Sequence, residues 1–412
     1  MAFTATTQTD YASFLKELYR GSTVADLCYD SNAVLALLPK NPNTGGTKYI
    51  KPIRYSFVNG RGADFSIARA NVSAADRDRW EMDWTNHYTI AAVTNKAMEL
   101  ASGAGRDGSF KDLLVDEVDS AHQAFANDVE VELHEDGSGR RADAAEAVGA
   151  TTALWFAVGP GQASNFDKGM VIGHLSAGSP PTAIGAGNET AVVTAVDRGG
   201  DRIKVAADFT TALVATDVIV LYGDANSKAN GLKAWLPGSG VAATAFNGVN
   251  RQADATRLAG VDGVKGTLSG LLITDGIVQT TAQIIRQGGK PNLALVSAAD
   301  FADLSNETEA RGRYAKVGAS TGTVSFSAIE IATPAGLLPV VPDRHTEDDQ
   351  AFILDTRKIE VYSTNSLPSL FNKDGSFYHR TETADELSFY LYGFYGLSIQ
   401  EPGSCSWVQD LY

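Results

Sequence analysis

The sequence predicts an α+β fold with an N-terminal arm, an extended β-hairpin, one long helix, a mixed α/β domain and an inserted small β-barrel. Three observations predict it. Apolar residues recur at steps of three or four in residues 109–139, which is typical of an amphipathic helix. Apolar and polar residues alternate in residues 47–58, as in a half-buried strand. Five short apolar runs separated by turn residues fill residues 154–222, which favours a small barrel or sandwich.

The first element is an arm, residues 1–46. A short helix is expected to carry Tyr11, Phe14 and Leu18 on one face, and a second apolar piece follows at residues 34–38. A segment this thin has too little bulk to bury its own apolar side chains. We therefore expect the arm to lie on another surface.

The second element is a projecting hairpin, residues 47–99. Residues 47–58 form its first strand, and the extended run of residues 80–98 forms its second. An isolated two-stranded ribbon is marginal in water, so this hairpin should lie against something else. An internal hairpin of a single domain is the alternative. The polar residues 59–79 between the strands make the expected tip locally basic through Arg61, Arg69, Arg77 and Arg79.

The third element, residues 100–152, contains the long helix and part of a surrounding domain. Acidic residues fill the faces of the helix away from its apolar stripe, and Gly137 and Gly139 end it because glycine readily adopts left-handed backbone angles. The run His134-Glu135-Asp136 is interpreted as a solvated helix end rather than a metal cluster, since adjacent helical residues point in different directions. The apolar stripe consists of Phe110, Leu114, Val118, Ala121, Phe125, Val129 and Leu133.

Three further segments complete the predicted organisation. Residues 153–224 form the β-rich insertion, in which we expect strands near residues 154–158, 170–175, 191–196, 203–206 and 218–222. Residues 225–341 have a mixed α/β pattern, with a helix ending at Gly288-Gly289, a strand at residues 293–296 and a second helix capped by Ser297. Residues 342–412 contribute return strands and a C-terminal segment.

Composition and motifs exclude several classes of function. The formal net charge is −15, with 34 basic against 49 acidic residues, which argues against a general nucleic-acid binder. Two cysteines are too few for a disulfide framework, and no leader peptide or membrane span is expected. No phosphate-binding loop, hydrolase elbow or zinc-type histidine spacing is present. Because these motifs are missing, we expect no catalytic residue, cofactor or metal. The one exception to consider is His345, which lies in an acidic loop where a cation has a small chance of binding.

The order of these parts resembles the major capsid proteins of tailed bacteriophages, which have the Hong Kong 97 fold. Short motifs carry the resemblance: Asn95-Lys96-Ala97 ends the hairpin, and Phe110-Lys111-Asp112-Leu113-Leu114 begins the long helix. Asp136-Gly137-Ser138-Gly139 closes that helix, and Gly231-Leu232-Lys233-Ala234-Trp235-Leu236-Pro237 follows the insertion. The sequence from Asp374-Gly375 to Glu386 is similar to the C-terminal pattern of the family.

The resemblance implies a Hong Kong 97-like head protein that assembles into hexamers and pentamers of an icosahedral shell around the genome. Residues 47–99 would be the extended loop, residues 100–152 the spine helix and part of the peripheral domain, and residues 225–341 the axial domain. It also implies a location in the virion after synthesis in the bacterial cytoplasm. The expected partners are further copies of the chain, a separate scaffolding protein or none, a portal and a decoration protein, with weak DNA contact and no membrane.

Two departures and one alternative accompany this resemblance. Some family members crosslink through a lysine of the extended loop, but residues 52–95 contain none. Some carry a long N-terminal scaffolding segment, whereas the hairpin here begins near Thr47. The alternative is an intracellular α/β enzyme or ligand-binding protein that uses the insertion as its binding module. If the chain is a capsid protein, we expect inter-subunit contacts from Arg61, Arg69, Arg77, Arg79, Tyr11, Phe14 and Leu18.

Overall fold

The structure is a computed structural model. It describes residues 32–42, 44–97, 113–146, 155–176, 182–183, 190–206, 209, 213–238, 240–241, 244–263, 272–311, 316–321, 324–372, 378–380, 385–409 and 411. The mixed α/β character predicted from the sequence is confirmed, with many strands and few helices. Among the described residues, no helix has the length and apolarity needed to cross a lipid bilayer.

The long helix α4 (Leu113–His134) confirms the predicted spine. At about 1.5 Å per residue, its 22 residues span roughly 33 Å. Gly137 and Gly139, at φ +89° and +82°, end it as expected. Phe110 lies outside the described residues, as does the side chain of Leu114, and Val118 is half-buried. The remaining members of the predicted stripe are buried: Ala121, Phe125, Val129 and Leu133.

A six-stranded sheet covers one side of this helix. Its main path is β1 (Lys40–Asn41), β18 (Ile359–Ser363), β21 (Glu386–Ile399) and β19 (Ser369–Leu370), and both β4 (Thr85–Thr94) and β20 (His379–Arg380) pair with β21. The pairing of β4 with β21 is antiparallel along the whole length of β4. Phe125 of α4 packs directly over Gly393 of β21, where an added Cβ would lie only 2.8 Å from the ring.

The hairpin differs from its prediction in two respects. Its strands are β2 (Tyr49–Arg54) and β3 (Arg77–Met82), paired in antiparallel register. The predicted second strand, residues 80–98, divides at Asp83–Trp84, because its later part is β4 and belongs to the sheet beside α4. The tip contains the short helix α2 (Phe65–Ala70), which the sequence analysis did not predict.

The segment between α4 and residue 222 forms a seven-stranded sheet with its own apolar core. All five predicted strands are present, and β5 and β8 join them. A bridge between Ala144 and Val158 links the ends of the outermost strands β5 and β6. The order along the sheet is β5 (Arg140–Asp143), β11 (Val218–Leu221), β7 (Val171–Ser176), β9 (Ala191–Asp197), β10 (Arg202–Val205) and β6 (Trp155–Ala157), with β8 (Thr182–Ala183) pairing with β7.

A second seven-stranded sheet carries the mixed α/β part. Helices α7 (Ile273–Arg286) and α8 (Ala298–Arg311) accompany it, and Ser297 caps α8 as predicted, since its Oγ accepts the amide of Asp300 at 3.1 Å. The order is β12 (Val261–Asp262), β22 (Ser406–Gln409), β17 (Gln350–Leu354), β13 (Leu293–Val296), β16 (Gly336–Pro342), β15 (Val324–Thr333) and β14 (Lys316–Thr321).

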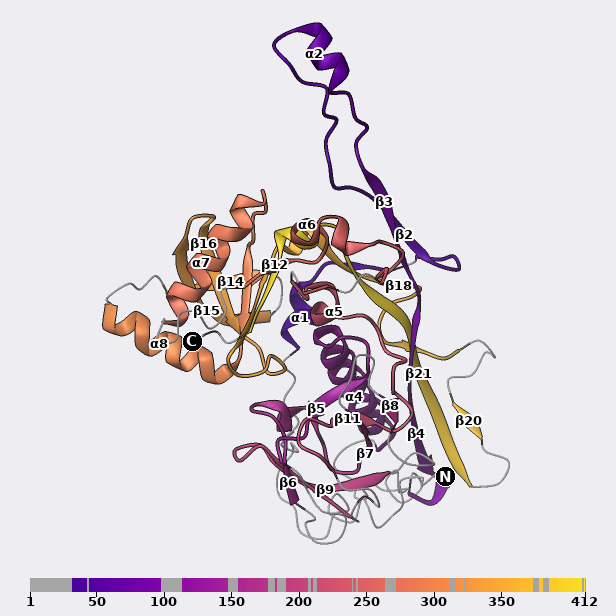
Figure 1. Cartoon of the computed structure of the whole chain (residues 1–412). Coiled ribbons are helices and arrows are strands. Elements are labelled where there is room, and N and C mark those ends of the chain that lie inside the picture. The colour runs from indigo at the N-terminus through magenta and orange to yellow at the C-terminus, as the bar shows by residue number, and fades with distance from the viewer. Residues whose placement is uncertain are drawn as a thin grey trace.

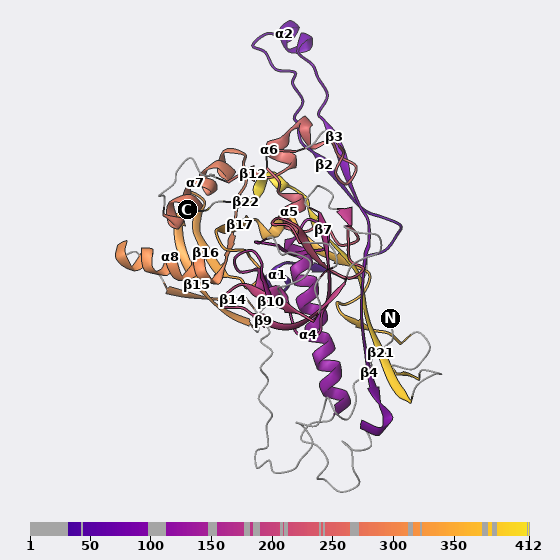
Figure 2. The same ribbon diagram turned by 60° about the horizontal axis from the view of Figure 1, so that its bottom comes forward.

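Short helices connect these parts: α1 (Ala33–Leu37) of the arm, α5 (Leu232–Trp235), α6 (Ala255–Leu258), and the 3₁₀ turns η1 (Gln162–Asn165), η2 (Arg251–Ala253), η3 (Thr356–Lys358) and η4 (Pro402–Ser404). Figures 1 and 2 show α4 at the centre of the molecule, with β4 and β21 alongside it. In Figure 1 the hairpin β2–β3 extends far beyond the body at one end, and the β5–β11 sheet lies at the other end.

Candidate functional site

The projecting hairpin is anchored at its base by aromatic contacts. Tyr49 stacks on Tyr362 with ring centroids 4.5 Å apart. Trp80 is fully buried and packs edge-on against Trp235 at 5.0 Å. Only the base of the hairpin is therefore part of the apolar core, and the rest extends away from the body (Figure 1).

The tip of the hairpin exposes apolar side chains. Asp64 caps helix α2, because its carboxylate accepts the amide of Ser66, and none of the helix residues is buried. Phe65 is 79% exposed, which leaves nearly its whole ring in contact with solvent. Apolar side chains gathered on one small projection suggest a surface that another protein covers. The others are Phe57, Val58, Ile67 and Val72.

The four predicted contact arginines lie in two places rather than one. Arg61 and Arg69 lie at the tip, one before and one within α2. Arg77 and Arg79 lie in β3, nearer the body, and Arg79 forms an ion pair with Glu81 at 2.7 Å. Sequence spacing alone did not show that β3 begins at Arg77. The predicted arm contacts Tyr11, Phe14 and Leu18 lie outside the described residues.

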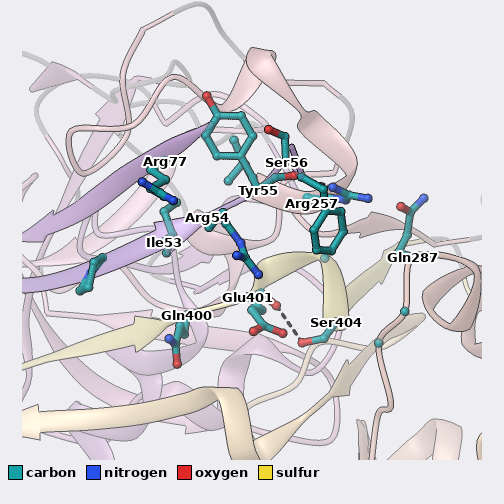
Figure 3. Close-up of a pocket in the computed structure, with 16 residues that line it drawn as sticks. Ile53, Arg54, Tyr55, Ser56, Arg77, Arg257, Gln287, Gln400, Glu401 and Ser404 are labelled. Atoms are coloured by element: carbon teal, nitrogen blue, oxygen red, sulfur yellow. Dashed lines mark hydrogen bonds between the residues drawn. The ribbon is translucent and has the colours of Figure 1, made fainter. Parts of the chain in front are cut away.

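A cavity of about 670 Å³ lies between the base of the hairpin and the mixed α/β part (Figure 3). One wall is the hairpin, where Arg54 lies over the ring of Phe57 at 5.3 Å. The other comes from α6, from the turn after α7 and from η4, and Arg257 of α6 donates to the carbonyl of Tyr55. Arginine and apolar side chains share the lining with two glutamines and the carboxylate of Glu401.

A third surface lies on the sheet beside α4. Strand β4 alternates, so that His87 points to α4 and contacts the Phe125 ring at 4.7 Å, while Tyr88 and Ile90 point to solvent. Tyr88 is 59% exposed and lies 6.1 Å from the ring of Phe394 on β21. The outer face of this sheet therefore presents aromatic and aliphatic side chains.

The prediction that acidic residues fill only the faces of the long helix away from the core is partly wrong. Glu130 and Glu132 are buried, because cationic and amide groups from distant segments surround them. Glu132 accepts from Lys228 at 2.8 Å, contacts His87 at 3.1 Å and receives the hydroxyl of Tyr395. Burial alone would raise its pKa, but His87 and Lys228 lower the pKa of Glu132 to about 2.

The prediction that the helix end is solvated is also wrong, since His134 and Glu135 are both buried. Lys233 joins Glu135 at 2.8 Å to Glu347 at 2.7 Å, and Arg140 contacts Glu347 at 2.9 Å. Burial alone would raise the pKa of Glu347, but the charges of Lys233 and Arg140 lower it to about 2. This ionic network connects the end of α4, strand β5, helix α5 and the loop after β16.

We expect Glu132→Gln to reduce stability at neutral pH by about 1–3 kcal/mol, because the buried ammonium of Lys228 loses one of its two carboxylate partners and keeps only Asp224. The pKa of Glu132 is lower in the folded protein, so its stabilisation is complete above its ordinary pKa and is lost as pH falls toward about 2. Urea denaturation of both proteins across that pH range measures the difference. A difference that stays constant down to about pH 2 would contradict this assignment.

His345 was predicted to lie in an acidic loop with a small chance of cation binding. It is buried, and its Nδ1 lies 2.8 Å from the side-chain oxygen of Asn165 in the insertion. Burial lowers the pKa of His345 to about 3, so the ring is neutral. Its immediate role in the structure is thus to join the loop after β16 to η1.

Comparisons with known proteins identify the family. Residues 111–412 match the family model described as SU10 major capsid protein. No curated protein sequence matches the chain. The capsid asymmetric unit of cyanophage A-1(L) superposes with a TM-score of 0.55 at 12% identity, over 98% of this chain and 98% of that chain. The capsid of an empty GTA particle superposes with a TM-score of 0.50 at 9% identity, over 95% and 94% of the two chains.

At such identities the structural matches establish a shared fold, and they agree with the resemblance noted in the sequence. The family assignment rests on the model match, which covers most of the 412 residues and includes α4 and both seven-stranded sheets. The chain belongs to the SU10 major capsid protein family.

Proposed function

We propose that this chain is the major head protein of a tailed double-stranded DNA bacteriophage and forms the hexamers and pentamers of an icosahedral shell. Its site of action is the virion, after synthesis in the bacterial cytoplasm. The observation that carries the proposal beyond family membership is the projecting hairpin, whose exposed apolar tip lacks a core of its own. Such a tip is completed by a neighbouring subunit.

We further propose a Hong Kong 97-like division of the chain. Residues 1–46 are the arm, 47–99 the extended loop, 100–152 the spine with part of the peripheral domain, and 225–341 the axial domain, while 342–412 return through the peripheral domain. Residues 153–224 form an inserted small barrel, and the bridge between Ala144 and Val158 supports closure of its sheet. Because β5 pairs with β11, the folded unit begins near Arg140.

The tip of one subunit docks on the next through contacts between different surfaces of identical chains. Such heterologous contacts close into rings when the rotation between subunits allows it. The aromatic face around Tyr88 and Ile90 is the receiving surface with the best chemical match to Phe65 and Ile67. Arg61 and Arg69 set the register of docking, and Arg77 and Arg79 contribute beside the cavity at the hairpin base. Tyr11, Phe14 and Leu18 extend the contact through the arm.

The proposal assigns a structural role and no catalysis, cofactor or membrane contact. Self-association is the first partnership. A portal, a decoration protein and a separate scaffolding protein are further partners of such a shell. The net charge of −15 supports weak contact with packaged DNA, since a polyanion is held only by a basic surface.

Electron microscopy of the purified full-length protein tests this function. We expect capsomer rings or closed shells, seen either with the chain alone or after co-expression with the scaffolding protein of the same phage. Size-exclusion chromatography with light scattering gives the mass of the same particles. Monomers of about the chain's mass under all of these conditions would contradict the proposal.

A further inference from the structure

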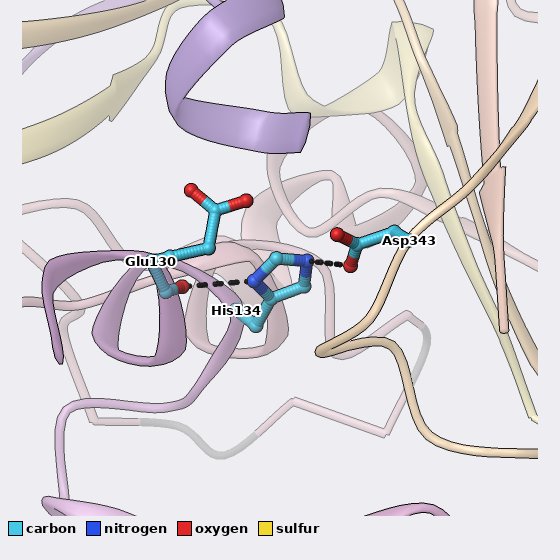
Figure 4. Close-up of side chains that lie close together, drawn as sticks. All are labelled: Glu130, His134 and Asp343. Carbon is cyan, nitrogen blue, oxygen red and sulfur yellow. Dashed lines mark hydrogen bonds and ion pairs between the residues drawn. The ribbon is translucent and has the colours of Figure 1, made fainter. Parts of the chain in front are cut away.

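Three metal-ligating side chains meet in the interior where the spine helix ends. Glu130 and His134 are four residues apart on α4, so they share one face of the helix. Asp343 immediately follows β16. One ligand atom from each of the three lies within 4.8 Å of the others, and all three side chains are buried (Figure 4).

The ring of His134 has the orientation that is common for a metal-binding histidine. Its Nδ1 lies 2.9 Å from the carbonyl oxygen of Glu130, which can only accept, so Nδ1 carries a proton. Metal-binding histidines commonly donate this second ring N–H to a backbone carbonyl or carboxylate, which fixes the tautomer. The other ring nitrogen, Nε2, faces Asp343 and lies 2.8 Å from its Oδ2.

Asp343 has one oxygen that nothing in the described part of the chain satisfies. Its Oδ2 accepts the amide and hydroxyl of Thr346 at 2.9 and 2.8 Å. Its Oδ1 has no hydrogen-bond partner among the described residues, although the side chain is fully buried. Figure 4 shows this oxygen on the side of the histidine ring where the Glu130 carboxylate lies.

Two carboxylates share one imidazole in this cluster, and burying a carboxylate without a counter-charge is costly. Burial accordingly raises the pKa of Glu130 to about 7. The nearby Arg141 is bound to Asp128 and to the carbonyl of Asn165, and Arg344 donates to the carbonyl of Ser164. A divalent cation beside a neutral imidazole would bring the charge of the cluster to zero.

We propose that Glu130, His134 and Asp343 bind a divalent first-row transition-metal ion, with one imidazole nitrogen and two carboxylate oxygens as protein ligands. This donor set suits Zn²⁺, which takes nitrogen and oxygen ligands in tetrahedral sites, and a water would be the fourth ligand beside the three protein atoms. On binding, Nε2 releases to solvent the proton that it shares with Asp343, and small side-chain rotations bring the three donors to coordination distance.

The metal would connect three segments that are distant in sequence. The carboxylate oxygens of Glu130 accept the amides of Val34 and Leu35 in α1 at 2.6 and 2.7 Å, and each retains a lone pair for a cation. The bound ion thereby holds the arm, the spine and the loop after β16 together. The site is independent of the proposed function, because its ligands all come from one chain.

The test uses the full-length protein, freed of metal with a chelator during refolding and then refolded with or without Zn²⁺. We expect one Zn²⁺ per chain by mass spectrometry of the metal content and a higher melting temperature for the Zn²⁺-loaded protein. Co²⁺ in place of Zn²⁺ should give the visible absorption of a tetrahedral site, and Mg²⁺ should give no increase in stability.

Two near-isosteric variants and one control locate the binding. His134→Gln and Asp343→Asn should each weaken Zn²⁺ binding at least about tenfold, whereas His122→Gln, on the same helix but outside the cluster, should bind normally. Equal melting temperatures for native protein with and without Zn²⁺ would overturn the proposal, even if a variant failed to fold. Zn²⁺ binding that His134→Gln and Asp343→Asn leave unchanged would also overturn it.

Discussion

The double substitution Phe65→Asp with Ile67→Asp is expected to abolish capsomer and shell formation while the chain stays folded. Phe65 and Ile67 are 79% and 53% exposed in the single chain, so polar replacements cost little folding stability. In an interface, a few well-packed apolar anchors carry most of the binding energy. Burying two carboxylates there without partners is strongly unfavourable. Negative-stain electron microscopy and light scattering measure assembly, and circular dichroism measures the fold.

A matched control separates the loss of apolar contact from the added charge. Ala63→Asp with Ser66→Asp adds the same two negative charges to the tip and keeps both anchors. Negative charge near the start of α2 is compatible with the helix dipole. This control should still assemble. Equal loss of assembly in both double variants would indicate that charge, rather than apolar contact, governs docking of the tip.

The alternative to apolar contact is that the charges of Arg61 and Arg69 govern docking of the tip. Exposed ion pairs contribute about 0–1 kcal/mol each, so reversing Arg61 and Arg69 to Glu should slow assembly more than it reduces the final yield. The effect should be larger at low salt, where screening is weak. Arg77 and Arg79 are less suitable for this comparison, because Arg79 already pairs with Glu81 inside the hairpin.

Periodic patterns predicted the regular elements of this fold well. The spacing of Ala121, Phe125, Val129 and Leu133 placed the buried side of the spine, because a helix face depends on residues close in sequence. Alternation placed β2, and short apolar runs placed the strands of the insertion. The order of the parts, together with weak motifs, led to the family that the model match identifies.

Features that depend on distant residues were missed. Glu130, Glu132 and His134 look like solvent-facing helix residues, and their partners Leu35, Lys228 and Asp343 lie far away in sequence. No local pattern signals such pairing. One signal was available, since Glu130 and His134 share a helix face at a spacing of four, but it becomes informative only once Asp343 is placed beside them.

The candidate contact surface was located in outline but not in detail. Two extended runs joined by a polar tip predicted the projection. The division between β3 and β4 depends instead on the pairing of β4 with β21, some 290 residues later. The arginines of residues 59–79 suggested a basic tip that contacts a neighbouring subunit through its charges. The exposed ring of Phe65 was missed because the few apolar residues of this polar segment form no periodic pattern.

Phe125→Ala is expected to destabilise the chain by about 3–5 kcal/mol. The ring is 1% exposed and fills the space between α4 and the sheet, against His87 and directly over Gly393. The close approach at Gly393 shows that the strand is shaped to receive the ring, so alanine leaves a cavity that rigid β21 cannot close. Urea denaturation of the unassembled chain, in the Phe65→Asp, Ile67→Asp background, measures the loss without a contribution from subunit contacts.

Val118→Ala is the matched control for this substitution, because Val118 lies on the same stripe but is only half-buried. It should lower the denaturation midpoint much less than Phe125→Ala. Far-ultraviolet circular dichroism at low urea checks that both variants retain the helix, so that the midpoint reports on packing and not on a different starting fold. Equal midpoints for Phe125→Ala and its background would mean that the packing of the spine against β21 contributes little to stability, contrary to the burial of that ring.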